Sequence, residues 1–203
     1  RADQPVLFGG HQLHAADATF PTFICDFTRM HWADELACEL GARRAMAGAD
    51  GHIRMKMNSL VDPGTIDELY AASQAGARIE LIIRGMCCLR PGVPGLSDNI
   101  SVRSVIGRYL EHARCYWFAN GEGRGNPHYL IGSADLMSRN LDRRVEALVP
   151  VIDPMAHKKL DRIIEANLAD TRRSWTLDPD GSWNAPNRSG TIEMHVLLHE
   201  QGS

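Results

Sequence analysis

The stretch HIRMKMNSLVDPGTIDELYAASQAGARIELIIR, residues 52–84, decides the fold. Apolar and polar residues alternate in residues 52–58, which predicts a strand with one apolar face. Residues 62–76 predict a helix, with an Asp-Pro start and a closing glycine. Residues 78–84 are almost continuously apolar, as in a parallel strand that is covered on both faces. The three elements form a β-α-β unit and predict an α/β fold whose mixed, largely parallel sheet is flanked by helices.

The segments that follow extend this unit. Residues 85–99 are rich in glycine and proline and predict a long loop. The remaining expected elements are a helix over 100–114, a hairpin of two strands at 114–118 and 128–133, a strand at 143–152, a helix over 153–168 and a turn-rich segment with edge tryptophans at 175–183. The hairpin turn carries Gly121, Gly123 and Gly125, but no GK[ST] sequence follows, so a hairpin is favoured over a phosphate loop.

The pattern of apolar and polar residues divides the chain into three parts. Residues 1–45 have no sustained period apart from a helix expected near 30–46. Residues 46–185 form the expected domain, and residues 186–203 form a tail.

Composition narrows the class of protein. The chain has 203 residues, 44% of them hydrophobic, and a net charge of −3, which is ordinary for a globular domain. It has no apolar run long enough for a membrane helix and no secretory signal, and its five cysteines form no CxxC pair. We therefore expect a cytoplasmic protein without an integral membrane segment, or one bound peripherally to the inner membrane. The balanced charge argues against a protein that coats nucleic acid, but it leaves room for a local basic pocket.

Candidate site residues gather at expected strand ends. Arg84 ends the second strand of the β-α-β unit, where open α/β sheets bind ligands. His112 with Arg114, followed by Gly-Ser-Ala-Asp at 132–135, is similar to one half of a phospholipase-D-like active site, in which an imidazole attacks phosphorus. That half-site would have a lysine in place of Arg114 and an aspartate in place of Ala119.

Cationic and polar side chains around these positions suit phosphate oxygens. The expected set is Lys56, Asn58, Arg84, Arg139, Arg143 and Arg144. Each arginine alone could equally be a solvated surface group, which we favour for Arg143 and Arg144. Asp135 or Glu146 could orient His112 by a hydrogen bond.

A second histidine pair lies near the carboxyl terminus. His195 and His199 stand one helical turn apart and could hold a metal ion. No third ligand follows at a known spacing, so a structural role is favoured and no metal ligands are assigned.

Two longer strings carry a resemblance to a known family. RMKMNSLVDPG…EHARCYWF (54–118) and SADLMSRNLDRRVEALVPVIDP (133–154) resemble the final domain of bacterial polyphosphate kinase, and the similarity extends over about 53–183. The resemblance implies a phospholipase-D-like α/β fold. It also implies an ATP:polyphosphate phosphotransferase that uses Mg²⁺ and a phosphohistidine. Arg84 and His112 match the arginine and histidine that bind nucleotide and phosphate in that family, with His112 as the catalytic residue and Lys56, Asn58, Asp135 and Arg139 in support.

One departure from the family changes the expectation. Members are several times longer, and the HHPY context of their phosphorylated histidine is absent from this sequence. We expect the chain to bind ATP, ADP and polyphosphate and to work as a homo-oligomer or with the missing amino-terminal half. The alternative is a catalytically incomplete module that binds nucleotide or polyphosphate, or that docks onto another subunit.

Overall fold

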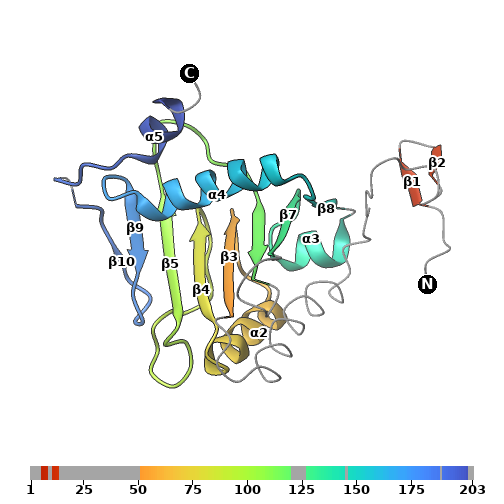
Figure 1. The fold of residues 1–203 in the computed structure, drawn as a ribbon. Helices are drawn as coiled ribbons and strands as arrows, with labels where there is room; N and C mark the ends of the chain where they lie inside the picture. The colour runs from red at the N-terminus through yellow and green to blue at the C-terminus, as the bar shows by residue number, and fades with distance from the viewer. Residues whose placement is uncertain are drawn as a thin grey trace.

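In a computed structural model, the described residues are 51–119, 127–144, 146–187 and 189–200, together with the backbone of 6–8 and 11–13 (Figure 1). The helix expected near 30–46 and the turn with Gly121, Gly123 and Gly125 lie outside the described residues. The elements are β1 (Val6–Phe8), β2 (His11–Leu13), β3 (His52–Met57), α2 (Pro63–Gln74), β4 (Arg78–Ile83), β5 (Ile100–Val105), β6 (Cys115–Phe118), β7 (His128–Gly132), α3 (Ser138–Arg143), β8 (Leu148–Pro150), α4 (Pro154–Ala169), β9 (Ser174–Leu177), β10 (Trp183–Asn184) and α5 (Met194–Glu200).

The expected β-α-β unit is present. Strands β3 and β4 pair in parallel, with Met55 beside Leu81, and α2 connects them. Asp62 caps α2 by accepting a hydrogen bond from the Thr65 amide at 2.9 Å, and Pro63 occupies the first turn. After the helix, Gly76 adopts φ 95°, which only glycine adopts without strain. The local signals in residues 52–84 therefore fix this unit as the sequence predicts.

Eight strands form one sheet in the order β10-β9-β5-β4-β3-β6-β7-β8. Only β3–β4 and β4–β5 are parallel, and the other five pairings are antiparallel. The α/β class and the mixed sheet are confirmed, but the expected largely parallel character is wrong. The reason is connectivity, because parallel neighbours need a long crossover, and the chain provides one only through α2 and through the loop after β4.

The helix expected over 100–114 is also wrong. Residues 100–105 form β5, which pairs in parallel with β4 and antiparallel with β9. Ile100 and Val102 fit a period of 2, whereas Val102 and Val105 fit a period of 3.6, so hydrogen bonding to two neighbouring strands decides between strand and helix. Tyr109 and Leu110, which would extend the apolar stripe of the helix, are 56% and 73% exposed. Residues 106–114 are irregular and lead into β6.

The remaining elements include one that the sequence did not predict. The hairpin β6–β7 and the helix α4 lie where they were expected, and the tryptophan-rich segment forms the edge hairpin β9–β10. Strand β8 covers only Leu148–Pro150 of the expected 143–152, because Arg143 is the last residue of α3. The short helix α3 was not predicted. No helix in the described part of the chain is long and apolar enough to cross a membrane.

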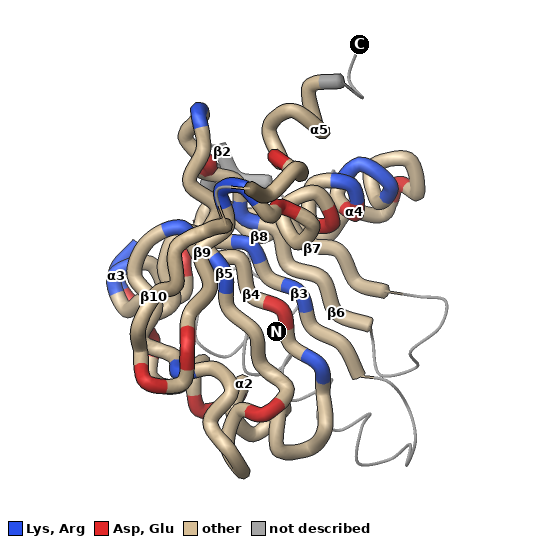
Figure 2. The backbone as a smooth tube through the Cα atoms, turned by 90° about the vertical axis from the view of Figure 1, so that its left-hand side faces the viewer, with Lys and Arg blue, Asp and Glu red and all other residues tan. Residues whose placement is uncertain are grey.

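Helices α2 and α4 lie on opposite faces of the sheet (Figures 1 and 2). The face toward α2 holds the main core, in which Met55, Leu81, Tyr116 and Leu69 are at most 1% exposed. The α4 side is more polar, and Tyr129 of β7 donates a hydrogen bond to Asp161 of α4 at 2.8 Å. The alternation predicted for β3 therefore separates an apolar core from a polar sheet face.

Candidate functional site

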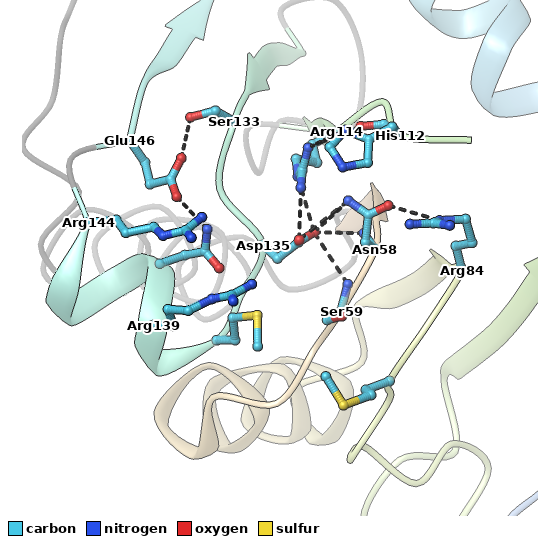
Figure 3. Close-up of a pocket in the computed structure, with 13 residues that line it drawn as sticks. Asn58, Ser59, Arg84, His112, Arg114, Ser133, Asp135, Arg139, Arg144 and Glu146 are labelled. Atoms are coloured by element: carbon cyan, nitrogen blue, oxygen red, sulfur yellow. Dashed lines mark hydrogen bonds and ion pairs between the residues drawn. The ribbon is translucent and has the colours of Figure 1, made fainter. Parts of the chain in front are cut away.

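A polar cavity of about 510 Å³ opens at one edge of the sheet (Figure 3). The carboxyl ends of β3, β4 and β7 meet there with the start of β6, because β6 runs antiparallel between β3 and β7. Helix α3 closes the side next to β7. Its lining residues are Asn58, Ser59, Arg84, Met86, His112, Arg114, Ser133, Asp135, Met137, Arg139, Asn140, Arg144 and Glu146.

Asp135 is the centre of the hydrogen-bond network. Its Oδ1 accepts from the Asn58 amide at 2.7 Å, and Arg114 donates to both carboxylate oxygens, at 3.2 and 2.9 Å. Burial by itself raises the pKa of Asp135, but the bonds from Arg114 and Asn58 outweigh it and lower the pKa below its usual value. The carboxylate therefore stays charged and ties the ends of β3 and β7 to the start of β6.

Arg84 and Asn58 connect the two parallel strands. Arg84 Nε donates to Asn58 Oδ1 at 3.0 Å, and its other two nitrogens make no hydrogen bond to any described residue. The strand ends approach closely here, since a Cβ on Gly85 would lie 2.9 Å from the Asn58 carbonyl oxygen. Asn58 thus fixes the position of Arg84 through Nε, and the two terminal nitrogens of the guanidinium group can bind a ligand.

His112 lies at the rim of the cavity and is exposed. Arg114 Nη1 lies 3.1 Å from His112 Nδ1 and also donates to the His112 carbonyl at 3.1 Å. A guanidinium has no acceptor, so Nδ1 must accept this bond and the proton of a neutral ring must sit on Nε2. The arrangement gives His112 a proton to donate and no free lone pair with which to attack phosphorus.

Helix α3 and the residue that follows it add two arginines to the cavity. Glu146 accepts hydrogen bonds from Ser133 Oγ at 2.5 Å and from Asn140 Nδ2, and so joins the end of β7 to α3. Arg139 and Arg144 line the cavity beside it and form no ion pair within the part of the chain that the structure describes. They are available for an anionic ligand.

The charges of the lining residues favour a polyanion. Arginines 84, 114, 139 and 144 outnumber the two carboxylates, and Asp135 and Glu146 are already engaged by donors. This donor set does not fit a magnesium site built by the protein, because Mg²⁺ needs several free oxygens. No group of three His, Cys, Asp or Glu side chains in the described residues could hold a metal ion. Among the residues that line the cavity, Asn140 Oδ1 is a buried oxygen without a hydrogen-bond partner.

Of the six site residues that the family resemblance implies, five line this cavity. They are Asn58, Arg84, His112, Asp135 and Arg139. Lys56 is not in its lining; the Lys56 side chain is 3% exposed and pairs with Glu111 at 2.9 Å. Strand alternation indicated a polar face for Lys56 but not that this face is covered.

The residue that contacts the His112 ring is Arg114 and not Asp135 or Glu146. Arg144 lines the cavity although we favoured a surface role for it, and Arg143 does not line it. Ser133, Asn140 and Met137 also lie in the lining, and the Gly-Ser-Ala-Asp segment was the one sequence signal that indicated part of this group.

The comparisons with known proteins agree on one family. A family model described as "Polyphosphate kinase C-terminal domain 2" matches residues 31–195. Polyphosphate kinase 1 of Chlorobaculum tepidum is 51% identical over 156 residues, which cover 77% of this chain and 22% of the relative. Polyphosphate kinase of Prochlorococcus marinus is 58% identical over 164 residues, which cover 78% of this chain and 23% of the relative.

A solved structure agrees with the sequence comparisons. The crystal structure of polyphosphate kinase from Porphyromonas gingivalis superposes with a TM-score of 0.76 at 33% identity, over 85% of this chain and 26% of that one. The chain thus spans less than a quarter of the length of the two curated relatives. The mixed α/β fold of this chain is therefore also found in a solved polyphosphate kinase. The chain belongs to the polyphosphate kinase C-terminal domain family.

Proposed function

We propose that this chain is the phosphate-binding carboxyl-terminal domain of a polyphosphate kinase, which transfers the terminal phosphate of ATP to polyphosphate. The observation that carries the proposal is the meeting of Arg84, Arg139 and Arg144 with His112 in one cavity whose two carboxylates already accept hydrogen bonds from neighbouring side chains. Phosphoryl transfer depends mainly on positioning and on charge stabilisation, and planar guanidinium groups supply both.

The tautomer of His112 supports a division of labour. With Nδ1 accepting from Arg114, Nε2 can donate its proton to a phosphate oxygen or a leaving group. The nucleophile that would become the phosphohistidine then belongs to a preceding domain, which matches the missing HHPY sequence. ATP and a polyphosphate of n units would give ADP and a chain one unit longer.

In this proposal Mg²⁺ binds to the phosphates of the substrate and not to a site of the protein. The family implies Mg²⁺, and the described residues do not fit a site of their own for it. An ion bound to the phosphates would supply charge neutralisation. The chain's own residues bind the remaining phosphate oxygens and orient the terminal group.

A second candidate function rests on the length of the match. Because the chain spans only 22–23% of its curated relatives, a module that binds phosphate chains or docks onto another subunit without transfer is the alternative. Dependence on the preceding domain separates the two. The free thiols Cys87, Cys88 and Cys115 support a cytoplasmic location. A homo-oligomeric state and peripheral membrane binding stay predictions.

Calorimetric titration with tripolyphosphate tests the binding site. The double variant Arg139→Gln/Arg144→Gln should raise the dissociation constant at least about tenfold, since each lost charge-assisted contact contributes on the order of 1.5 kcal/mol. The matched control is Arg90→Gln/Arg172→Gln, which removes the same charge outside the cavity. Equal weakening by both pairs would mean that tripolyphosphate responds only to total charge and would refute the site.

A further inference from the structure

We propose that His195 of α5 is a positioning residue for His112 and acts through Glu111, so that the carboxyl-terminal helix holds the segment that carries the catalytic histidine. We call the three side chains Lys56, Glu111 and His195 the Glu111 clamp. The proposal deepens the proposed function and rests on it, because it concerns the residue beside His112.

The segment that the clamp holds needs an anchor. Residues 106–114 run from the end of β5 to the start of β6 without regular structure, and Ile106, Tyr109 and Leu110 are more than half exposed. At its beginning, the Ile106 amide donates to the Arg173 carbonyl at 3.3 Å. At its end, Glu111 reaches back into the protein immediately before His112. The position of His112 therefore depends on where Glu111 is held.

Two buried side chains hold the Glu111 carboxylate, one a lysine and the other a histidine. Its Oε2 lies 2.9 Å from Lys56 Nζ, and its Oε1 lies 3.0 Å from His195 Nε2. The side chains of Lys56 and His195 are 3% and 8% exposed. Burial raises the pKa of Glu111, but the charge of Lys56 and the bonds from Lys56 and His195 lower it overall, so the carboxylate is charged. A charged group satisfied on both oxygens has one preferred position.

Packing around His195 fixes the helix end of the clamp. A Cβ on Gly107 would lie 2.2 Å from His195 Nδ1, so the glycine leaves the space that the ring fills. The Tyr109 ring meets the His195 ring edge-on at 5.2 Å. Met194, the first residue of α5, is 0% exposed, and its amide donates to Asp170 Oδ2 at 2.7 Å. Helix α5 thus closes onto both ends of the 106–112 segment.

None of the three clamp residues lines the cavity. Their effect on the site would pass through the backbone that joins Glu111 to His112, whose ring is fixed on the other side by Arg114. Displacements of about 1 Å at a catalytic group can cost roughly 100-fold in rate. This geometry gives His195 a positioning role, where the sequence pattern had suggested either a metal ligand or a structural residue.

Substitutions at His195 separate the hydrogen bond from the packing. His195→Gln keeps a donor at the position of Nε2, and His195→Leu fills the space without a donor. Val196→Ala, on an exposed position of the same helix, is the control. Gly107→Ala is a second route, because its Cβ would displace the His195 ring.

The readout is the ¹⁵N NMR signature of the His112 ring, with tripolyphosphate titration of each variant. His195→Leu and Gly107→Ala should shift or broaden the His112 Nδ1 resonance and raise the tripolyphosphate dissociation constant about tenfold, the scale of one lost hydrogen bond near 1.4 kcal/mol. His195→Gln and Val196→Ala should match the wild type.

An unchanged His112 signature in both His195→Leu and Gly107→Ala would overturn the proposal, whatever the titration gives. Failure of His195→Gln to restore the wild-type signature would also overturn it, because packing alone would then explain the effect. The double variant at Arg139 and Arg144 tests the phosphate site separately, so failure of that site is distinguishable from failure of the clamp.

Discussion

At the scale of single residues, the site depends on which side chains already have partners. Asp135 and Glu146 accept hydrogen bonds from neighbouring side chains, whereas Arg139 and Arg144 form no ion pair within the described residues. Arg84 is intermediate, since one nitrogen holds Asn58 and the rest of the fork faces the cavity. The internal bonds fix the geometry, and the remaining donors determine what can bind.

Arg84→Lys should raise the tripolyphosphate dissociation constant about tenfold, because an ammonium cannot bond Asn58 and grip two phosphate oxygens in the same plane. Isothermal titration measures the change. Arg90→Lys, on an exposed loop residue outside the cavity, is the matched control and should bind as the wild type does. Equal affinity of the Arg84→Lys and wild-type proteins would contradict a bidentate role.

At the scale of elements, the sequence predicts the β-α-β unit well because its signals are local. Asp62, Pro63 and Gly76 mark the ends of α2, and alternation marks β3. Strand β5 could not be predicted in the same way, since its apolar spacing also fits a helix and only pairing with β4 and β9 decides. Helix α3 has six residues and too short a pattern to recognise.

The same limit applies to the candidate site. Arg84, His112 and Asp135 could be predicted because each lies at a strand end or in a motif. Lys56 pairs with Glu111, which lies far from it in the sequence, so the burial of Lys56 could not be predicted from sequence spacing. In the sequence, Arg114 stood out only because it differs from the lysine of the half-site. Its contact with His112 could be found only in the three-dimensional structure.

Gly85→Ala should destabilise the protein by about 1–3 kcal/mol, since the added Cβ would lie 2.9 Å from the Asn58 carbonyl oxygen and force β3 and β4 apart at the site. Urea unfolding measures the loss, and tripolyphosphate titration should show weaker binding in the folded variant. An alanine protein as stable as the wild type would mean that the two strand ends can separate freely.

Strands β3 and β4 also share an acid-sensitive contact. Glu80 accepts from His52 at 2.7 Å and from Arg78 at 2.6 Å. Burial raises its pKa, but these partners outweigh burial and lower the pKa from 4.5 to about 2. A lowered folded-state pKa stabilises the protein above the unfolded value, and this contribution is lost as the pH falls from about 4.5 toward 2.

Glu80→Gln should therefore cost on the order of 3 kcal/mol of unfolding free energy at pH 7, and the difference from wild type should shrink below pH 4.5. Urea unfolding at a series of pH values tests this. Glu165→Gln, on an exposed position of α4, should have little effect at any pH. A difference that persists unchanged at low pH would exclude the charge of Glu80 as its cause.

At the scale of the whole molecule, a chain with a net charge of −3 places Arg84, Arg114, Arg139 and Arg144 around one cavity at the strand ends. Strands β3, β4, β6 and β7 begin or end at this cavity, so the site depends on the central pairings of the sheet. In the function that we propose, Nε2 of His112 donates a proton and the phosphoryl acceptor lies on another domain of the enzyme. The central claim is that this domain contributes half of a transfer site.

The most direct test is transfer of ³²P from [γ-³²P]ATP to a polyphosphate primer with Mg²⁺, using this chain alone and together with an amino-terminal half of a polyphosphate kinase that carries the HHPY sequence. We predict no labelled polyphosphate from the chain alone and transfer on complementation. His112→Ala, at an exposed position, should abolish most of that transfer without unfolding the domain. Labelled polyphosphate from the chain alone, or complemented transfer that His112→Ala leaves unchanged, would contradict the account.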